Sequence, residues 1–383
     1  MAKITQYIKK DGTTAYKFNL YIGVDPVTGR KMNTTRRGFK SVAAAKTALK
    51  RLEYEVQQNG FKKEKVYTYN EIYLLWIEQY KNTVKESTLQ KTTKLFEHHI
   101  LPLFSELKIN KIDSAYCQKA VNKWFKEGLT SYKIILRYTA KVFKMAVNMG
   151  IITSDPTTRV TLPIKRETEI IEELPNFYDK EELEQFYSAL QKEDNKKNLA
   201  LFRLLAFTGA RIGEILALEW RDIDFKGNTL LISKTLTRGL NNRLMVDVPK
   251  TRNSIRTISL DKTTLQLLRL WKTKQAEDYF KLGFNTSSNK QPVFTNSKNE
   301  YVNSAKVYKE YIKLVEKYNL KKITIHGFRH THCSLLFEAG ATIKEVQDRL
   351  GHTDVKTTMN IYAHVSKKSK DNTAANFADH VGF

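Results

Sequence analysis

Cysteine is almost missing from this chain of 383 residues, which has only Cys117 and Cys333, far apart in the sequence. Two isolated thiols provide neither a disulfide framework nor the CxxC pairs of a zinc site. No apolar run approaches the roughly 18 residues of a membrane-crossing helix, and the opening MAKITQYIKK has no apolar core of a secretory signal. We therefore expect a cytoplasmic protein in a reducing compartment.

Acidic residues are also scarce, with 40 Asp and Glu against 65 Lys and Arg, a formal net charge of +25. Within residues 1–65 the imbalance is fifteen basic to five acidic residues. Such a balance favours a polyanionic partner, because each Lys or Arg near a phosphate releases counterions. Nucleic acid is the favoured partner; an anionic membrane surface and a merely solvated lysine-rich surface are the alternatives.

Several catalytic signatures are absent. There is no GxxxxGK[ST] nucleotide loop. The pair His98-His99 is adjacent instead of spaced i,i+4, so it does not predict a metal site. A metal-dependent transposase would need three carboxylates around divalent ions, and no feature singles out three. We expect no cofactor and no metal, and full activity in EDTA would exclude the transposase alternative.

The first predicted unit, residues 1–65, combines a small sheet with one helix. Turn chemistry at Asp11-Gly12 and at 25–29 separates its strands, and Ser41 is a suitable N-cap. The predicted elements are strands Ile4–Lys9, Ala15–Gly23 and Lys31–Phe39 and a helix Ser41–Gln58. A small basic sheet of this kind can present a β-ribbon to a DNA groove.

Helical periodicity dominates the second unit, residues 66–165, and a linker at 156–176 with three prolines precedes the third unit, residues 177–383. The helices predicted in the second unit are Tyr69–Tyr80, Ser87–Ile100, Ser114–Glu127 and Ser131–Met149. Those of the third are Asp179–Gln191, Asn198–Phe207, Arg211–Leu218, Thr263–Phe280, Ser304–Tyr318, His330–Ala339, Thr342–Leu350 and Lys356–Ala363. Its strands are Asn228–Lys234, Arg243–Val248 and Ile255–Ser259, the last two joined by a turn at 250–253. The predicted fold class is mainly α with small β-sheets.

Candidate groups for phosphodiester chemistry gather in the third unit. Metal-free cleavage of a phosphodiester needs a nucleophile, cations over the non-bridging oxygens and a proton donor for the leaving oxygen. Arg211 follows a Thr208-Gly209 break, His326 and Arg329 share one face of a helical turn, and Tyr362 comes ten residues after His352. Five of the eight histidines lie between His326 and His364.

These boxes resemble those of the tyrosine recombinases. Ala210-Arg211-Ile212-Gly213-Glu214 resembles their first arginine box, His326-Gly327-Phe328-Arg329-His330-Thr331 their HxxRH box, and Leu350-Gly351-His352 followed by Tyr362 their final box. The motifs span residues about 200–365. The first two units resemble the arm-type DNA-binding and helical core-binding domains of phage and conjugative-transposon integrases in size, order and character only.

The resemblance implies a role for each residue. Arg211 and Arg329 would clamp the scissile phosphate, and His326 and His352 would add hydrogen bonds to it. Tyr362 would attack, leaving a 3′-phosphotyrosine and a free 5′-hydroxyl. The family's general acid, a lysine on a β-hairpin turn, is matched by Lys250, with Lys234 as a rival. Glu214 matches a supporting acidic position, and His330 would be structural.

The resemblance also implies partners and rival functions. The expected enzyme is a site-specific recombinase that integrates or excises a mobile element. It would act as a homotetramer on double-stranded DNA with arm-type and core-type sites and without a membrane. An excisionase and a DNA-bending host protein are the candidate protein partners. The alternatives are a type IB topoisomerase-like enzyme and a non-catalytic DNA-binding regulator.

Overall fold

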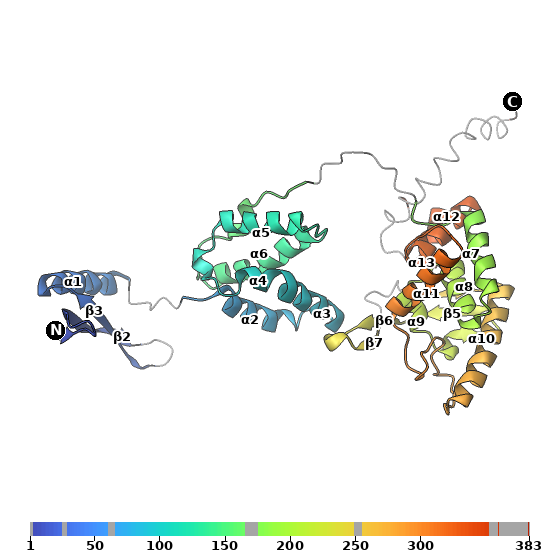
Figure 1. Cartoon of the computed structure of the whole chain (residues 1–383), viewed down its shortest axis with the longest axis horizontal. Coiled ribbons are helices and arrows are strands. Elements are labelled where there is room, and N and C mark those ends of the chain that lie inside the picture. The colour runs from blue at the N-terminus through green and yellow to red at the C-terminus, as the bar shows by residue number, and fades with distance from the viewer. Residues whose placement is uncertain are drawn as a thin grey trace. The chain divides into compact units, whose positions relative to one another are not determined.

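The structure is a computed structural model that describes residues 3–24, 29–59, 66–164, 175–248, 255–351, 359 and 382. The chain divides into two compact units. From here on, the first unit is Met1–Tyr73, Phe104–Lys119 and Tyr138–Val160, and the second unit is Leu74–Leu103, Ala120–Arg137 and Thr161–Phe383. Figure 1 labels the elements, and we describe each unit by itself. The predicted division at 1–65, 66–165 and 177–383 stays a prediction.

The N-terminal sheet confirms the predicted three strands and helix. Strands β1 (Ile4–Ile8), β2 (Thr14–Val24) and β3 (Lys31–Phe39) form an antiparallel sheet in the order β1-β2-β3. Helix α1 (Val42–Asn59) covers one face, where Phe18 packs with Ala45 and Leu52. Alternation along the strands leaves the other face to polar side chains.

The following helices confirm most of the predicted ones: α2 (Tyr69–Tyr80), α5 (Ser114–Lys126) and α6 (Tyr132–Asn148). In the first unit the buried ring of Tyr69 packs against Phe104 and Phe143. In the second unit the indole N–H of Trp124 donates to the carbonyl of His99.

The predicted helix Ser87–Ile100 is helical throughout, but its last five residues are π-helical and the helix continues to Phe104. The structure has α3 (Glu86–Leu95), a π-helical turn (Phe96–Ile100) and α4 (Leu101–Phe104). Leu101 donates its N–H to the carbonyl of Phe96, five residues back. Pro102 is the physical reason, because its ring has no N–H to donate and clashes with the carbonyl four residues earlier in an ordinary helix.

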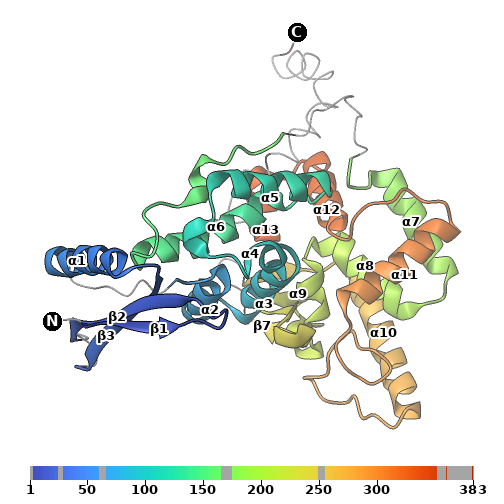
Figure 2. The ribbon, with the colours of Figure 1, turned by 60° about the vertical axis from the view of Figure 1, so that its left-hand side comes forward.

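Helix α8 (Lys196–Thr208) is the centre of the largest apolar core in the second unit. It contacts α7 (Lys180–Lys192), α10 (Lys262–Lys281) and α12 (Gly327–Glu338), as Figure 2 shows. Phe202 packs there against Phe186 and Phe328. The predicted capping box of Asp179 and Glu182 begins α7. Helix α11 (Ser304–Lys317) is also as predicted.

The strands of the second unit pair differently from the prediction. Strands β4 (Ile223–Asp224), β5 (Thr229–Ile232) and β8 (Arg256–Ser259) form one antiparallel sheet, and β6 (Thr235–Arg238) pairs with β7 (Leu244–Asp247) in another. Strands β7 and β8 therefore lie in different sheets, and the predicted turn at 250–253 lies outside the described residues. The prediction missed β4 and β6, which are only two and four residues long.

The last two helices of the described part are α12, which contains His330 and His332, and α13 (Ile343–Leu350). Helix α12 begins at Gly327, three residues before the predicted start, because the hydroxyl of Thr324 accepts the Gly327 N–H at 3.0 Å. Helix α13 has the predicted Thr342–Glu345 capping box and ends at Gly351 with φ +67°. The predicted helix Lys356–Ala363 lies outside the described residues, apart from Met359.

The structure also describes the two cysteines and the hydropathy of the helices. Both cysteines are buried and free of any disulfide. Over the described ranges, no helix has the combination of length and hydropathy that a bilayer crossing requires.

Candidate active site

Arg211 stands at the junction between α8 and the short helix α9 (Ile212–Leu216). The chain turns there through Gly209, whose φ of +62° is a conformation that favours glycine. A Cβ at this position would lie 2.5 Å from a Leu350 methyl carbon and 2.8 Å from the ring of His332. Glycine therefore lets the first arginine box approach the end of α13 closely.

Glu214, with a side chain only 5% exposed, accepts hydrogen bonds from both the backbone and the side chain of Arg211. One carboxylate oxygen accepts the backbone N–H of Arg211 at 2.9 Å, and the other accepts its guanidinium at 3.0 Å. Arg256 on β8 pairs with the same carboxylate at 2.8 Å. Burial raises the pKa of Glu214, but its hydrogen bonds and its pairing with Arg256, with a smaller effect of Arg211, leave the pKa below its ordinary value. The carboxylate is therefore ionised at neutral pH.

Arg329 is almost fully buried, and its guanidinium joins two motifs. It donates to the carbonyl of Gly209 at 2.8 Å and to the carbonyl of Leu350 at 2.8 Å. Gly209 precedes the first box, and Leu350 belongs to the third. Burial, followed by the charge of Arg211, lowers the pKa of Arg329. A guanidinium nevertheless stays protonated at neutral pH.

His326 lies directly before α12, and its ring packs edge-on against that of His330, with 4.9 Å between centroids. Burial lowers the pKa of His326 to about 4, with additional contributions from the charges of His330, Arg329 and Arg211. His326 is therefore neutral at pH 7 and can donate or accept a proton. The mutual electrostatic effects of Arg211, His326 and Arg329 place these residues, which were predicted from two separate motifs, in one region.

Sequence reasoning missed three supporting residues: Arg256, His332 and Arg349. Arg349 donates to the Nε2 atom of His332 at 3.0 Å, so Nε2 is the acceptor and Nδ1 carries the proton. That Nδ1 donates to the carbonyl of Ala206 at 2.9 Å. A position three residues beyond Arg329, on a buried helix face, was the available signal for His332. The two arginines had no signal beyond their abundance.

Lys234, the rival general acid, is engaged elsewhere. Its Nζ lies 2.9 Å from a Glu219 oxygen and 2.9 Å from an Asp222 oxygen, and its side chain is 14% exposed. An amine paired with two carboxylates is not available to a leaving oxygen unless both ion pairs break. This pairing favours the other candidate, Lys250. Lys250, His352 and Tyr362 all lie outside the described residues.

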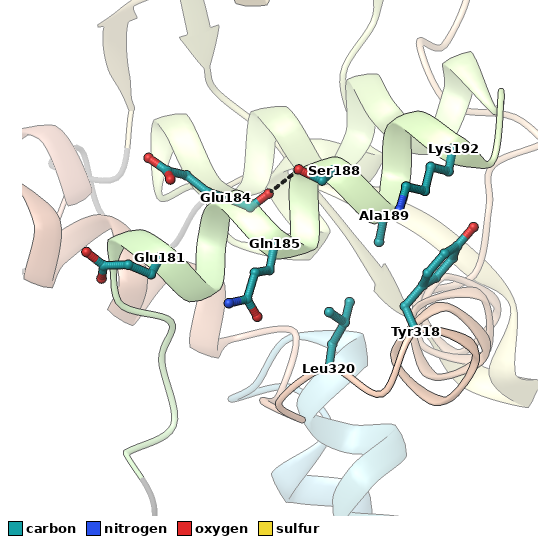
Figure 3. A pocket seen from close by; sticks show the side chains of 8 residues that line it. All are labelled: Glu181, Glu184, Gln185, Ser188, Ala189, Lys192, Tyr318 and Leu320. Atoms are coloured by element: carbon teal, nitrogen blue, oxygen red, sulfur yellow. Dashed lines mark hydrogen bonds between the residues drawn. The ribbon is translucent and has the colours of Figure 1, made fainter.

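A surface hollow between α7 and the end of α11 has the wrong chemistry for a phosphate. Figure 3 shows Glu181 and Glu184 on its α7 side and Tyr318 opposite. Carboxylates repel a DNA backbone, and none of the predicted site residues lines the hollow. The buried cation cluster around Arg329 is therefore the better candidate for phosphate chemistry.

Comparison with known proteins extends over the whole chain. Residues 176–369 match the phage integrase family. Residues 68–125 match the N-terminal SAM-like domain of phage integrases, and residues 5–56 match an arm DNA-binding domain. A protein of Caldanaerobacter subterraneus subsp. tengcongensis, named tyrosine recombinase XerC-like, is 30% identical, and the alignment covers 99% of each chain.

Two solved structures share the fold. The integrase of transposon Tn1549, in complex with transposon right end DNA, superposes with a TM-score of 0.65 at 22% identity, covering 80% of this chain and 100% of that chain. The lambda integrase tetramer bound to a Holliday junction gives a TM-score of 0.57 at 16% identity, covering 93% and 94%. These likenesses confirm the predicted fold class.

The buried histidines predict an acid-sensitive fold. Burial lowers the pKa of His332 to about 3, from the ordinary 6.5. Between these values the folded chain binds fewer protons than the unfolded chain, so stability is lost as the pH falls from about 6.5 towards 3. The slope of the free energy of unfolding should reach about 1.4 kcal/mol per pH unit for this residue.

Urea titrations followed by tryptophan fluorescence at several pH values would measure this slope. A His332→Gln variant, which cannot take up a proton, should show a shallower slope. The solvent-facing His98→Gln serves as the control and should match the unmodified chain. An equal slope in all three proteins would contradict the prediction.

Proposed function

Because this chain belongs to the phage integrase family and is a tyrosine recombinase, we propose that it cuts and rejoins DNA strands through a covalent bond to Tyr362. The observation that carries the proposal is the buried cation cluster, in which Arg211 and Arg329 both act electrostatically on His326. Two fixed guanidiniums match the charge that develops on a phosphate in the transition state. The neutral His326 has the capacity to take a proton.

The proposed cleavage step balances without a cofactor. The phenolic oxygen of Tyr362 attacks phosphorus, the phenolic proton goes to His326, and the bond from phosphorus to the 5′ oxygen breaks. Lys250 donates a proton to that oxygen, and His352 donates a hydrogen bond to the phosphate. The 3′-phosphotyrosyl bond retains the energy of the broken bond, so a second 5′-hydroxyl can reverse the steps and join new strands without ATP.

Two contacts with DNA per protomer follow from the proposed domain division at 1–65, 66–165 and 177–383. A hollow along the N-terminal sheet is mainly polar, with Lys3, Thr5, Lys17, Asn19, Asn33 and Thr35 along it. Its two lysines outnumber its one carboxylate, that of Glu53. Lysines suit phosphates, and amides suit base edges in a major groove. We infer that this face binds an arm-type site while the remaining units bind the core site.

The proposed assembly is a homotetramer on two duplexes inside a bacterial host cell. The lambda integrase structure, a tetramer on a Holliday junction, supports that stoichiometry by similarity of fold. An excisionase and a DNA-bending host protein would set the direction of the reaction. A chain with separate arm and core contacts suits integration and excision of a phage or other mobile element.

Replacing the nucleophile should abolish the covalent complex. Tyr362→Phe lacks the attacking oxygen, so it should bind attachment-site DNA normally yet give no adduct on a nicked suicide substrate that traps the phosphotyrosine. Tyr308→Phe, on the exposed surface of α11, is the matched control and should trap as the unmodified chain does. An adduct with Tyr362→Phe would show that another residue attacks.

The two lysines should behave differently. Lys250→Ala should slow cleavage by roughly 100-fold, the usual size of a lost general acid. A substrate with sulfur at the 5′ bridging position should restore the rate, because a thiolate leaves without a proton. Lys234→Met should instead lower stability, because it removes the cation paired with the buried Asp222, whereas Glu219 keeps its pairing with Arg221. No rescue of Lys250→Ala by sulfur would remove Lys250 from the general-acid role.

The arm contact should be visible in the salt dependence of binding. Lys17→Ala should weaken binding to arm-site DNA and reduce the slope of log affinity against log salt by about one. Lys46→Ala, an exposed change on α1, tests whether any lysine in this unit has the same effect. Equal losses in both variants would indicate that the sheet face is not the contact.

A further inference from the structure

The carboxylate of Glu214 is shared evenly between two arginines. One oxygen accepts the backbone N–H of Arg211 at 2.9 Å and Nη2 of Arg256 at 2.8 Å. The other accepts Nη1 of Arg211 at 3.0 Å and Nη1 of Arg256 at 3.3 Å. Arg211 is 42% exposed at its side chain, whereas Arg256 is 6% exposed. Of the two arginines, Arg211 is therefore the one that is accessible to a ligand.

The net charge of Arg211, Glu214 and Arg256 together determines how strongly this site attracts a phosphate. Arg211 and Glu214 alone would have no net charge, and a phosphate would gain little by approaching such a pair. Adding Arg256 gives the trio a net charge of +1. Because Arg256 is buried beside the carboxylate, it offsets the negative charge of Glu214 and leaves the positive charge of the exposed Arg211 for a ligand.

Arg256 has a second contact that ties the trio to the third box. Its Nε donates to the carbonyl of Arg349 at 2.9 Å, in the last turn of α13. The carbonyls at the end of a helix carry partial negative charge and lack partners within the helix. Arg329 satisfies the next carbonyl, that of Leu350. Two guanidiniums thus cap α13 immediately before Gly351 and His352.

We propose that Arg256 is a positioning residue for the recombination reaction: it neutralises Glu214, so that the charge of Arg211 acts on the scissile phosphate, and it fixes the end of α13 beside Arg211. Arg256 does not touch the DNA. Its contribution passes through Arg211, and this inference therefore rests on the proposed role of Arg211 in phosphate binding.

The test compares cleavage rates at saturating DNA on two suicide substrates. One has an ordinary scissile phosphate, and the other has a methylphosphonate there, which lacks one negative charge. Arg256→Met should cleave the ordinary substrate at least roughly tenfold more slowly while its dissociation constant for DNA changes little. On the methylphosphonate the deficit should shrink, because less charge needs to be balanced.

Further variants keep the test decisive if Arg256→Met folds poorly. Arg256→Lys keeps the charge and should retain more activity than Arg256→Met. The double variant Glu214→Gln/Arg256→Met restores the +1 count and should cleave faster than Arg256→Met alone. Arg203→Met removes another arginine paired with a carboxylate, Asp261, and should leave the ratio of the two substrates unchanged.

The outcomes separate the inference from the proposed function. If Arg256 variants lose the same factor on both substrates, or lose only DNA affinity, the positioning role is wrong. Arg211→Ala is measured in parallel. If Arg211→Ala is not slowed on the phosphate substrate, or is not improved by the methylphosphonate, the proposed role of Arg211 itself fails. If it behaves as proposed while Arg256 does not, only the inference fails.

Discussion

The guanidinium of Arg329 donates to the carbonyls of Gly209 and Leu350, and these two hydrogen bonds hold together segments that lie about 140 residues apart in the chain. Both acceptors are backbone atoms next to motifs that the chemistry needs. In the proposed reaction the same guanidinium would also bind phosphate, so that the frame and the chemistry would depend on one residue. The other contacts of the site offset the free-energy cost of burying this cation in the core.

Burying several cations together is costly, and the structure offsets the cost in specific ways. Arg256 shares Glu214, while Arg349 donates to His332, to the carbonyl of Phe207 and to Ser259. The helix end of α13 supplies partial negative charge without adding a carboxylate that would repel DNA. The buried carboxylate of Glu214 contacts this arginine cluster, and it is divided between Arg211 and Arg256. The site therefore keeps a positive balance despite its burial.

Much of the fold was predictable because the local signals were strong. The turns at Asp11-Gly12, the capping boxes at Asp179 and Thr342, and the glycine at the end of α13 each determine structure within a few residues. The strand pairing around β6 and β7 was not, because four-residue strands carry little pattern and their partners are set by tertiary contacts. The π-turn at Phe96–Ile100 was signalled by Pro102, a cue that periodicity alone does not weigh.

The site shows the same contrast. Arg211, His326 and Arg329 were identifiable because they belong to short motifs that can be recognised from the sequence alone. Arg256 and Arg349 are two arginines among many basic residues, and nothing in the sequence separates a buried capping guanidinium from a solvated one. Their roles depend on which carbonyl lies nearby, and that is a property of the folded chain alone.

The protonation state of His326 connects this frame to the reaction. In the free protein, burial and the neighbouring cations keep the imidazole neutral at pH 7. In the proposed mechanism, a phosphate seated against Arg211 and Arg329 would bring a negative charge that offsets those cations and raises the pKa of the imidazole. The ring would then become a better proton acceptor when DNA binds, which is when the proposed phenol nucleophile has to lose its proton. The two cations by themselves disfavour a protonated His326, so substrate binding would remove the electrostatic obstacle to the proposed first step.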